Sequence, residues 1–219
     1  MRLQSAIFDM DGTLVDSMAV WNDASSRLLR QRGIEPDPAT QEKIMSLTLR
    51  QGVDYCRETY GLSETTDELM DMVMAYMEEF YTHHVELKPG VKKFLSLLKM
   101  EGVWMYVATN TDRRLVEIAL KRTGIDGYFR GILTCAEVGV GKRESAEIYE
   151  RCMRRLQSNK KDTVVFEDAI HAIRTAKAAG FRVCAVYDAP AADKQEEIRS
   201  ISDYYIHSFE EMFTSETTG

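Results

Sequence analysis

Apolar residues along the chain form two kinds of stretch, which occupy different parts of the sequence. Between residues 18 and 88 they recur at helical spacing, as in the stripe from Leu69 to Phe80, and there is little strand signal. From residue 89 onward, helical stretches alternate with short apolar runs. The pattern predicts a helical segment followed by an α/β region.

Six short apolar runs predict strands, and the last of them predicts an edge strand. They cover residues 3–8, 104–109, 131–135, 163–168, 182–187 and 203–207. Strand–helix alternation of this kind predicts a parallel sheet with helices on both faces. The helical segment interrupts the alternation directly after the first strand. We therefore expect one α/β core domain from residues 1–17 and 89–219, with an α-helical domain inserted at 18–88.

Composition excludes several classes of protein. The 219 residues are 44 % hydrophobic and 29 % charged, as in globular proteins, and the net charge of −7 argues against a nucleic-acid binder. No run approaches the ~18 apolar residues of a membrane span, and no signal peptide is evident. The four cysteines and four histidines show no metal-ligand spacing. We expect a cytoplasmic protein with free thiols and no nucleic-acid or membrane partner.

Two acids follow the first strand. Asp9 and Asp11 are spaced so that extended chain would place them on one side, and Gly12 permits a tight turn beside them. Adjacent anions repel one another and favour a bound cation, and Mg²⁺ prefers such oxygen ligands. Ligands of doubly wound sheets bind at the carboxyl ends of the strands, where these acids lie.

Polar residues end other strands as well. Glu167 and Asp168 end the fourth run, and Thr109 ends the second beside a helix start, where backbone N–H groups favour anions. Lys142 adds positive charge in the loop after the third run. The GVGKR run is not a Walker A motif, because Arg143 replaces the required Ser or Thr. The set predicts a phosphoryl site without a P-loop.

The run DMDGTLVDS at residues 9–17, with Thr109, Lys142 and the Glu167–Asp168 pair in that order, resembles the motifs of the haloacid dehalogenase (HAD) superfamily. The similarity is greatest to its β-phosphoglucomutase-like and phosphoglycolate-phosphatase-like branch, and it spans roughly residues 5–188. It implies a HAD-like Rossmannoid α/β core with an inserted α-helical cap.

The resemblance also implies a reaction: Mg²⁺-dependent hydrolysis of a small phosphomonoester, such as a sugar phosphate, through an aspartyl-phosphate. Asp9 would be the nucleophile, and Asp11 the general acid and then the base. Thr109 and the Asn110 amide would hold the phosphoryl oxygens, and Lys142 would pair with Asp9 and the phosphate.

The same resemblance implies a metal site. Asp9, the backbone carbonyl of Asp11 and Asp168 would hold Mg²⁺, and Glu167 would be a second metal-site acid or would orient a metal-bound water. Arg50 in the helical insertion is a candidate for binding a substrate anion, and Arg113 a candidate for contacting phosphate or the cap. Arg50 is equally compatible with an ordinary surface arginine, and a solvated side chain is a further alternative for Arg113.

Departures from the family pattern leave alternatives open. The loop after Lys142 lacks the prolines of many relatives and is one residue longer, so Arg143 could take the lysine position. Trp21 stands where the mutases have a histidine, which favours a hydrolase over a mutase or phosphotransferase. Asp11 argues against a C–halogen hydrolase. A non-catalytic binding protein remains a further alternative, and a monomer or weak homodimer is expected.

Overall fold

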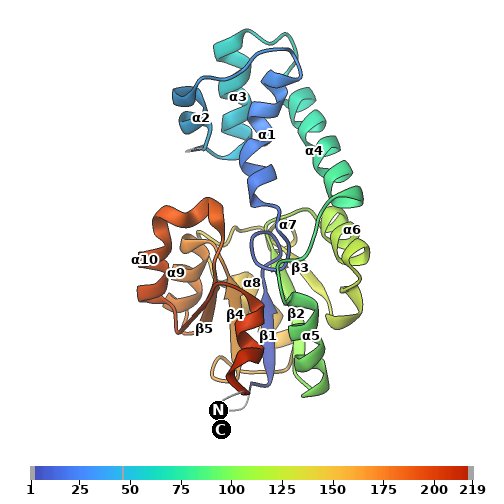
Figure 1. Cartoon of the computed structure of the whole chain (residues 1–219), viewed down its shortest axis with the longest axis vertical. Helices are drawn as coiled ribbons and strands as arrows, with labels where there is room; N and C mark the ends of the chain where they lie inside the picture. Colours follow the sequence, from blue (N-terminus) through green and yellow to red (C-terminus); the bar gives the residue numbers. More distant parts are fainter. Residues whose placement is uncertain (1–2, 46, 217–219) are drawn as a thin grey trace. The chain divides into compact units, whose positions relative to one another are not determined.

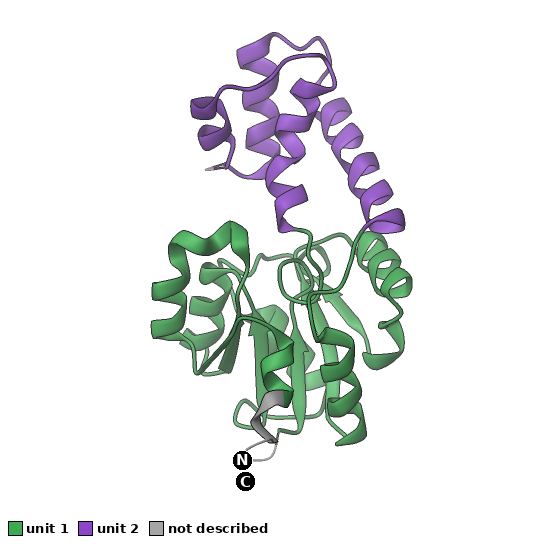
Figure 2. Cartoon of the chain, in the orientation of Figure 1, with its two compact units in different colours: residues 1–17, 85–219 green, residues 18–84 purple. Residues whose placement is uncertain are grey.

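The computed structural model describes residues 3–45 and 47–216, which form two compact units (Figure 2). The first unit comprises Met1–Ser17 and Val85–Gly219, and the second comprises Met18–His84. The second unit thus ends at His84, and Val85 already belongs to the first unit.

A six-stranded, all-parallel sheet forms the centre of the first unit, in the order β3-β2-β1-β4-β5-β6 (Figure 1). The strands are β1 (Ser5–Phe8), β2 (Trp104–Thr109), β3 (Ile132–Thr134), β4 (Thr163–Glu167), β5 (Arg182–Val186) and β6 (Tyr204–Ile206). This order confirms the predicted α/β fold with β6 at an edge. It also places a topological switch point between β1 and β4, where ligands of such sheets bind.

Helices cover both faces of this sheet. They are α5 (Val91–Met100), α6 (Arg113–Thr123), α7 (Cys135–Val138), α8 (Glu147–Arg155), α9 (Ile170–Ala178) and α10 (Gln195–Ile201), with 3₁₀ turns η1 (Asp126–Tyr128), η2 (Ala189–Lys194) and η3 (Phe209–Glu216). Successive strand residues point to opposite faces, so neighbours on β1 enter different cores. Phe8 stacks on Phe166 of β4 with ring centroids 4.5 Å apart, in a core completed by α5 and η3. Ile7 packs with α8, α9 and α10 on the other face.

Over its described residues, the second unit consists of helices and the loops that connect them. It contains α1 (Met18–Arg30), α2 (Pro38–Met45), α3 (Leu49–Tyr60) and α4 (Thr66–His83). Capping boxes fix the starts of α3 and α4, through Thr48 with Gln51 and Thr65 with Glu68. Trp21 packs inside this unit, where its Nε1 donates to the Tyr81 hydroxyl at 2.8 Å.

The two chain segments that join the units are hydrogen-bonded to each other within the first unit. The Asp16 amide donates to the Glu86 carbonyl and the Lys88 amide to the Leu14 carbonyl, both at 3.0 Å. An antiparallel bridge joins Val15 and Leu87 between them. No helix in the described part of the chain is both long and apolar enough to cross a membrane.

Candidate active site

Three buried acids meet at the switch point of the sheet. The Asp9 amide donates to the Phe166 carbonyl at 2.9 Å, so β1 ends directly beside the end of β4. This pairing brings Asp9 next to Glu167 and Asp168, and one carboxylate oxygen from each lies within 4.8 Å of the others. They are the only such acidic group among the residues that the structure describes.

Lys142 is buried among these acids. Its Nζ lies 2.7 Å from Asp9 Oδ1 and 2.9 Å from Glu167 Oε2, and the residue is 1 % exposed. Before it, α7 ends at Val138 and is followed by Gly139, whose φ of 83° suits a residue without a Cβ and turns the backbone. Its neighbour Arg143 is exposed. The structure therefore places the lysine, and not the arginine, beside Asp9.

Burial and mutual repulsion shift the pKa values of these groups. Burial, followed by the nearby Asp9, raises the pKa of Glu167 well above its usual value, against the attraction of Lys142. Burial, Asp9 and Asp188 raise the pKa of Asp168 to about 8, although the Thr13 hydroxyl donates to it at 2.9 Å. Asp9 and Glu167 share the Lys142 ammonium, while the cation that acts on Asp168 is Lys88. The excess negative charge of the three carboxylates is buried, where it is costly.

Burial also opposes the charge on Lys142, but Asp9 and Glu167 outweigh it, and the pKa of this ammonium rises above its usual value. The lysine therefore stays charged. Glu167 Oε1 is buried and accepts no hydrogen bond from the described residues. A set of carboxylate oxygens with excess negative charge and one oxygen without a partner fits a hard divalent cation such as Mg²⁺.

Asp11 is not a member of this acidic group. The chain leaves the extended conformation after Asp9, since the Met10 carbonyl accepts the amides of Leu14 and Val15 and Gly12 adopts a φ of 76°. The Asp11 carboxylate instead accepts from two hydroxyls at 2.6 Å, those of Ser17 and Thr111. The expectation of side-by-side carboxylates assumed extended chain, whereas the backbone turns directly after Asp9.

The other residues singled out in the sequence lie in three different places. Thr109, at the end of β2, is buried, and its hydroxyl accepts from the Thr111 amide at 3.1 Å. Asn110 follows it and is exposed.

The two candidate arginines are both engaged in ion pairs. Arg113 donates to both oxygens of Glu137 at 2.7 and 2.9 Å, which ties α6 to α7. Arg50 belongs to the second unit, where it pairs with Asp67 at 2.7 Å on the surface.

Several polar contacts of the site were not predicted. Thr13 and Ser17 belong to the motif at residues 9–17, so their hydroxyls were visible as candidates. Thr111 lies two residues after a strand end that was already singled out. Tyr149, whose hydroxyl donates to Glu167 at 3.1 Å, gave no signal, because an aromatic residue on the apolar side of a helix is typical of core packing.

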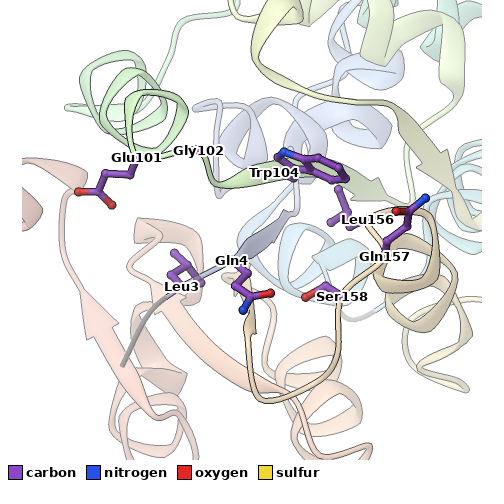
Figure 3. Close-up of a pocket in the computed structure, with 8 residues that line it drawn as sticks. All are labelled: Leu3, Gln4, Glu101, Gly102, Trp104, Leu156, Gln157 and Ser158. Carbon is purple, nitrogen blue, oxygen red and sulfur yellow. The ribbon is translucent and has the colours of Figure 1, made fainter.

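A cavity of about 340 Å³ lies at the opposite end of the sheet, where β1 and β2 begin (Figure 3). Trp104 and Leu156 line it together with the polar residues Gln4, Gln157 and Ser158. It contains no cluster of acids comparable to the group around Asp9. The acidic cluster found among the described residues therefore lies at the carboxyl ends of the strands and not at this cavity.

Comparisons with known proteins agree with this geometry. A family model described as haloacid dehalogenase-like hydrolase matches residues 6–186. The chain is 26 % identical over 178 residues to a phosphorylated carbohydrates phosphatase from Thermotoga maritima, covering 81 % of this chain and 82 % of the relative. It is 29 % identical over 189 residues to phosphoglycolate phosphatase 1 from Pseudomonas aeruginosa, covering 82 % and 68 %. Among solved structures, a Thermotoga maritima protein provisionally described as a β-phosphoglucomutase matches with a TM-score of 0.83 and 24 % identity over 98 % of each chain, a likeness of fold.

Proposed function

The chain belongs to the haloacid dehalogenase-like hydrolases, and from this premise we propose that it is a Mg²⁺-dependent phosphatase of a small phosphomonoester. The motif resemblance is thereby confirmed. The observation that carries the proposal is the buried ion pair of Asp9 with Lys142, beside Glu167 and Asp168. The similarity to phosphatases of phosphorylated carbohydrates and of phosphoglycolate supports a small phosphorylated metabolite as substrate.

Asp9, Asp168 and Glu167 would hold Mg²⁺, with the backbone carbonyl of Asp11 as a further ligand. When bound, the ion would offset the repulsion between the attacking carboxylate and the phosphate dianion and stabilise the charge on the phosphoryl oxygens. Lys142 would also offset this repulsion, since it holds a fixed positive charge 2.7 Å from Asp9 Oδ1.

Asp9 would act as the nucleophile. Its carboxylate attacks phosphorus, and the bond from phosphorus to the substrate's alkoxide oxygen breaks as Asp11 gives that oxygen a proton. Asp11 then removes a proton from a water molecule, which attacks the aspartyl-phosphate, releases inorganic phosphate and regenerates Asp9. The hydroxyls of Ser17 and Thr111 fix the orientation of Asp11 for both proton transfers. Thr109 and the Asn110 amide would hold the transferring phosphoryl group.

We also propose that the second unit, Met18–His84, is a cap that selects the leaving group and helps to exclude water. The paired segments around Val15 and Leu87 would serve as its hinge. Trp21, which stands where the mutases have a histidine, has no acid–base group to control phosphoryl transfer. This residue favours hydrolysis over transfer to a second substrate.

The experiment compares the wild type with Asp9→Asn on p-nitrophenyl phosphate and a panel of sugar phosphates. We expect phosphate release by the wild type that needs Mg²⁺ and is abolished by EDTA, and loss of at least about 10³-fold in kcat for Asp9→Asn, because an amide is a poor nucleophile. Asp126→Asn, at an exposed aspartate of η1, is the matched control and should retain activity. Turnover by Asp9→Asn at the control's rate would exclude Asp9 as the nucleophile.

A further inference from the structure

Tyr149 is a fully buried tyrosine on α8 whose hydroxyl has no part in the proposed reaction. Its ring lies edge-on to Phe181 with centroids 6.2 Å apart, as expected of a core residue. Its hydroxyl, however, donates to Glu167 Oε2 at 3.1 Å, and its ring centroid lies 5.7 Å from Lys142 Nζ. A core aromatic residue thus contacts two members of the acidic site.

The two oxygens of Glu167 differ sharply in their partners. Oε2 receives both the Lys142 ammonium at 2.9 Å and the Tyr149 hydroxyl at 3.1 Å. Oε1 is equally buried but accepts no hydrogen bond from the described residues. A carboxylate oxygen offers two lone pairs, so Oε2 is fully used while Oε1 remains available.

We infer that Tyr149 is a positioning residue for the cation site: its hydroxyl, with Lys142, occupies Glu167 Oε2 and so leaves Oε1 as the oxygen available to a cation. This inference rests on the proposed function, because it concerns the same cation site. It also assigns Tyr149 a second effect. Lys142 is shared between Asp9 and Glu167. The Tyr149 hydroxyl supplies one of the hydrogen bonds that Glu167 accepts, so the ammonium stays close to Asp9.

The test is Mg²⁺ binding by Tyr149→Phe, measured by titrating MgCl₂ into the metal-free protein in a calorimeter. Losing a hydrogen-bond partner of a metal-ligating group commonly lowers metal affinity about 10-fold or more. We expect a dissociation constant for Mg²⁺ about 10-fold higher than in the wild type. The Mg²⁺ concentration for half-maximal activity should rise in parallel, while KM for the phosphomonoester at saturating Mg²⁺ stays unchanged.

Tyr106→Phe is the matched control. Tyr106 belongs to the same apolar cluster, and its hydroxyl accepts a hydrogen bond from Arg155 at 2.7 Å. This variant should bind Mg²⁺ as the wild type does. In a Glu167→Gln background, Tyr149→Phe should cause no further loss of Mg²⁺ affinity, because the tyrosine acts through that carboxylate.

Three outcomes would overturn the inference while leaving the proposed function intact. They are wild-type affinity for Mg²⁺ in Tyr149→Phe, an equal loss in Tyr106→Phe, and an undiminished effect of Tyr149→Phe in the Glu167→Gln background. Failure of Tyr149→Phe to fold would also overturn it, because that result would show that the hydroxyl is needed for the stability of the fold. Failure of the wild type itself to bind Mg²⁺ would instead refute the proposed cation site, and the inference with it.

Discussion

Lys142 is the residue on which the electrostatics of the site depend. It is the buried cation that lies against Asp9 and Glu167, and its position is surrounded by protein rather than solvent. Removing one partner of a buried ion pair is far more destabilising than losing an exposed one, since the remaining charges keep their desolvation cost. The same residue is therefore expected to matter for folding as well as for turnover.

We expect Lys142→Met to lower the free energy of unfolding of the metal-free protein by about 3–5 kcal/mol. Arg143→Met, at the exposed neighbour, should change it by no more than about 0.5 kcal/mol. Urea denaturation followed by circular dichroism, with EDTA present, measures both. A larger loss for Arg143→Met than for Lys142→Met would show that the arginine holds the position assigned here to the lysine.

At this scale the sequence predicted which strand ends would supply chemistry, and the structure brings Asp9, Lys142 and the Glu167–Asp168 pair together. It did not predict the residues that support them. Thr111 and Asp11 are 100 residues apart, and Tyr149 and Glu167 are 18 apart on different elements. Such contacts depend on how a helix is oriented over the sheet, which no local pattern encodes.

At the scale of elements, Lys88 connects three segments of the first unit. Its Nζ donates to the Gly12 carbonyl at 2.7 Å, the Tyr187 carbonyl at 2.6 Å and Asp188 Oδ1 at 2.8 Å. Gly12 lies in the turn after β1, and Asp188 is a buried acid shortly after β5. One side chain from the returning linker thus holds together two loops at the carboxyl end of the sheet.

We expect Lys88→Met to lower the free energy of unfolding by about 3 kcal/mol, because the buried Asp188 loses the ammonium and two carbonyls lose a donor. Lys121→Met, at an exposed lysine of α6, serves as the control and should cost less than about 0.5 kcal/mol. Both values come from urea denaturation under identical conditions. Equal stability of the two variants would mean that the contacts of Lys88 contribute nothing net.

The elements themselves were largely predictable, because long periodic runs dominate the chain. All six predicted strands are present, and the helical region from residue 18 forms four helices. The short helix Cys135–Val138 was not predicted, because four residues are too few to show a period. Its capping box, Thr134 with Glu137, was the available signal. This omission matters, because α7 begins the loop that delivers Lys142.

At the scale of the whole molecule, the proposed cation site would make the stability of the fold depend on a bound cation. The strand order that joins β1 to β4 was not predictable from periodicity, since the order of strands in a sheet is set by packing. That order nevertheless determines which charges meet. Folding must bring the buried acids Asp9, Glu167 and Asp168 together, whereas in the unfolded chain they are separated and hydrated.

A cation that binds only the folded chain stabilises it by mass action, by about 2.7 kcal/mol at a concentration 100 times the dissociation constant. We therefore expect Mg²⁺ to raise the free energy of unfolding of the wild type by about this amount over an EDTA-treated sample at equal ionic strength. In Asp168→Asn the increment should fall to near zero, because one ligand and one charge are lost. Paired urea titrations with and without MgCl₂ measure both increments. An increment of equal size in Asp168→Asn would place the stabilising ion elsewhere, since a site at the junction of β1 and β4 depends on that carboxylate.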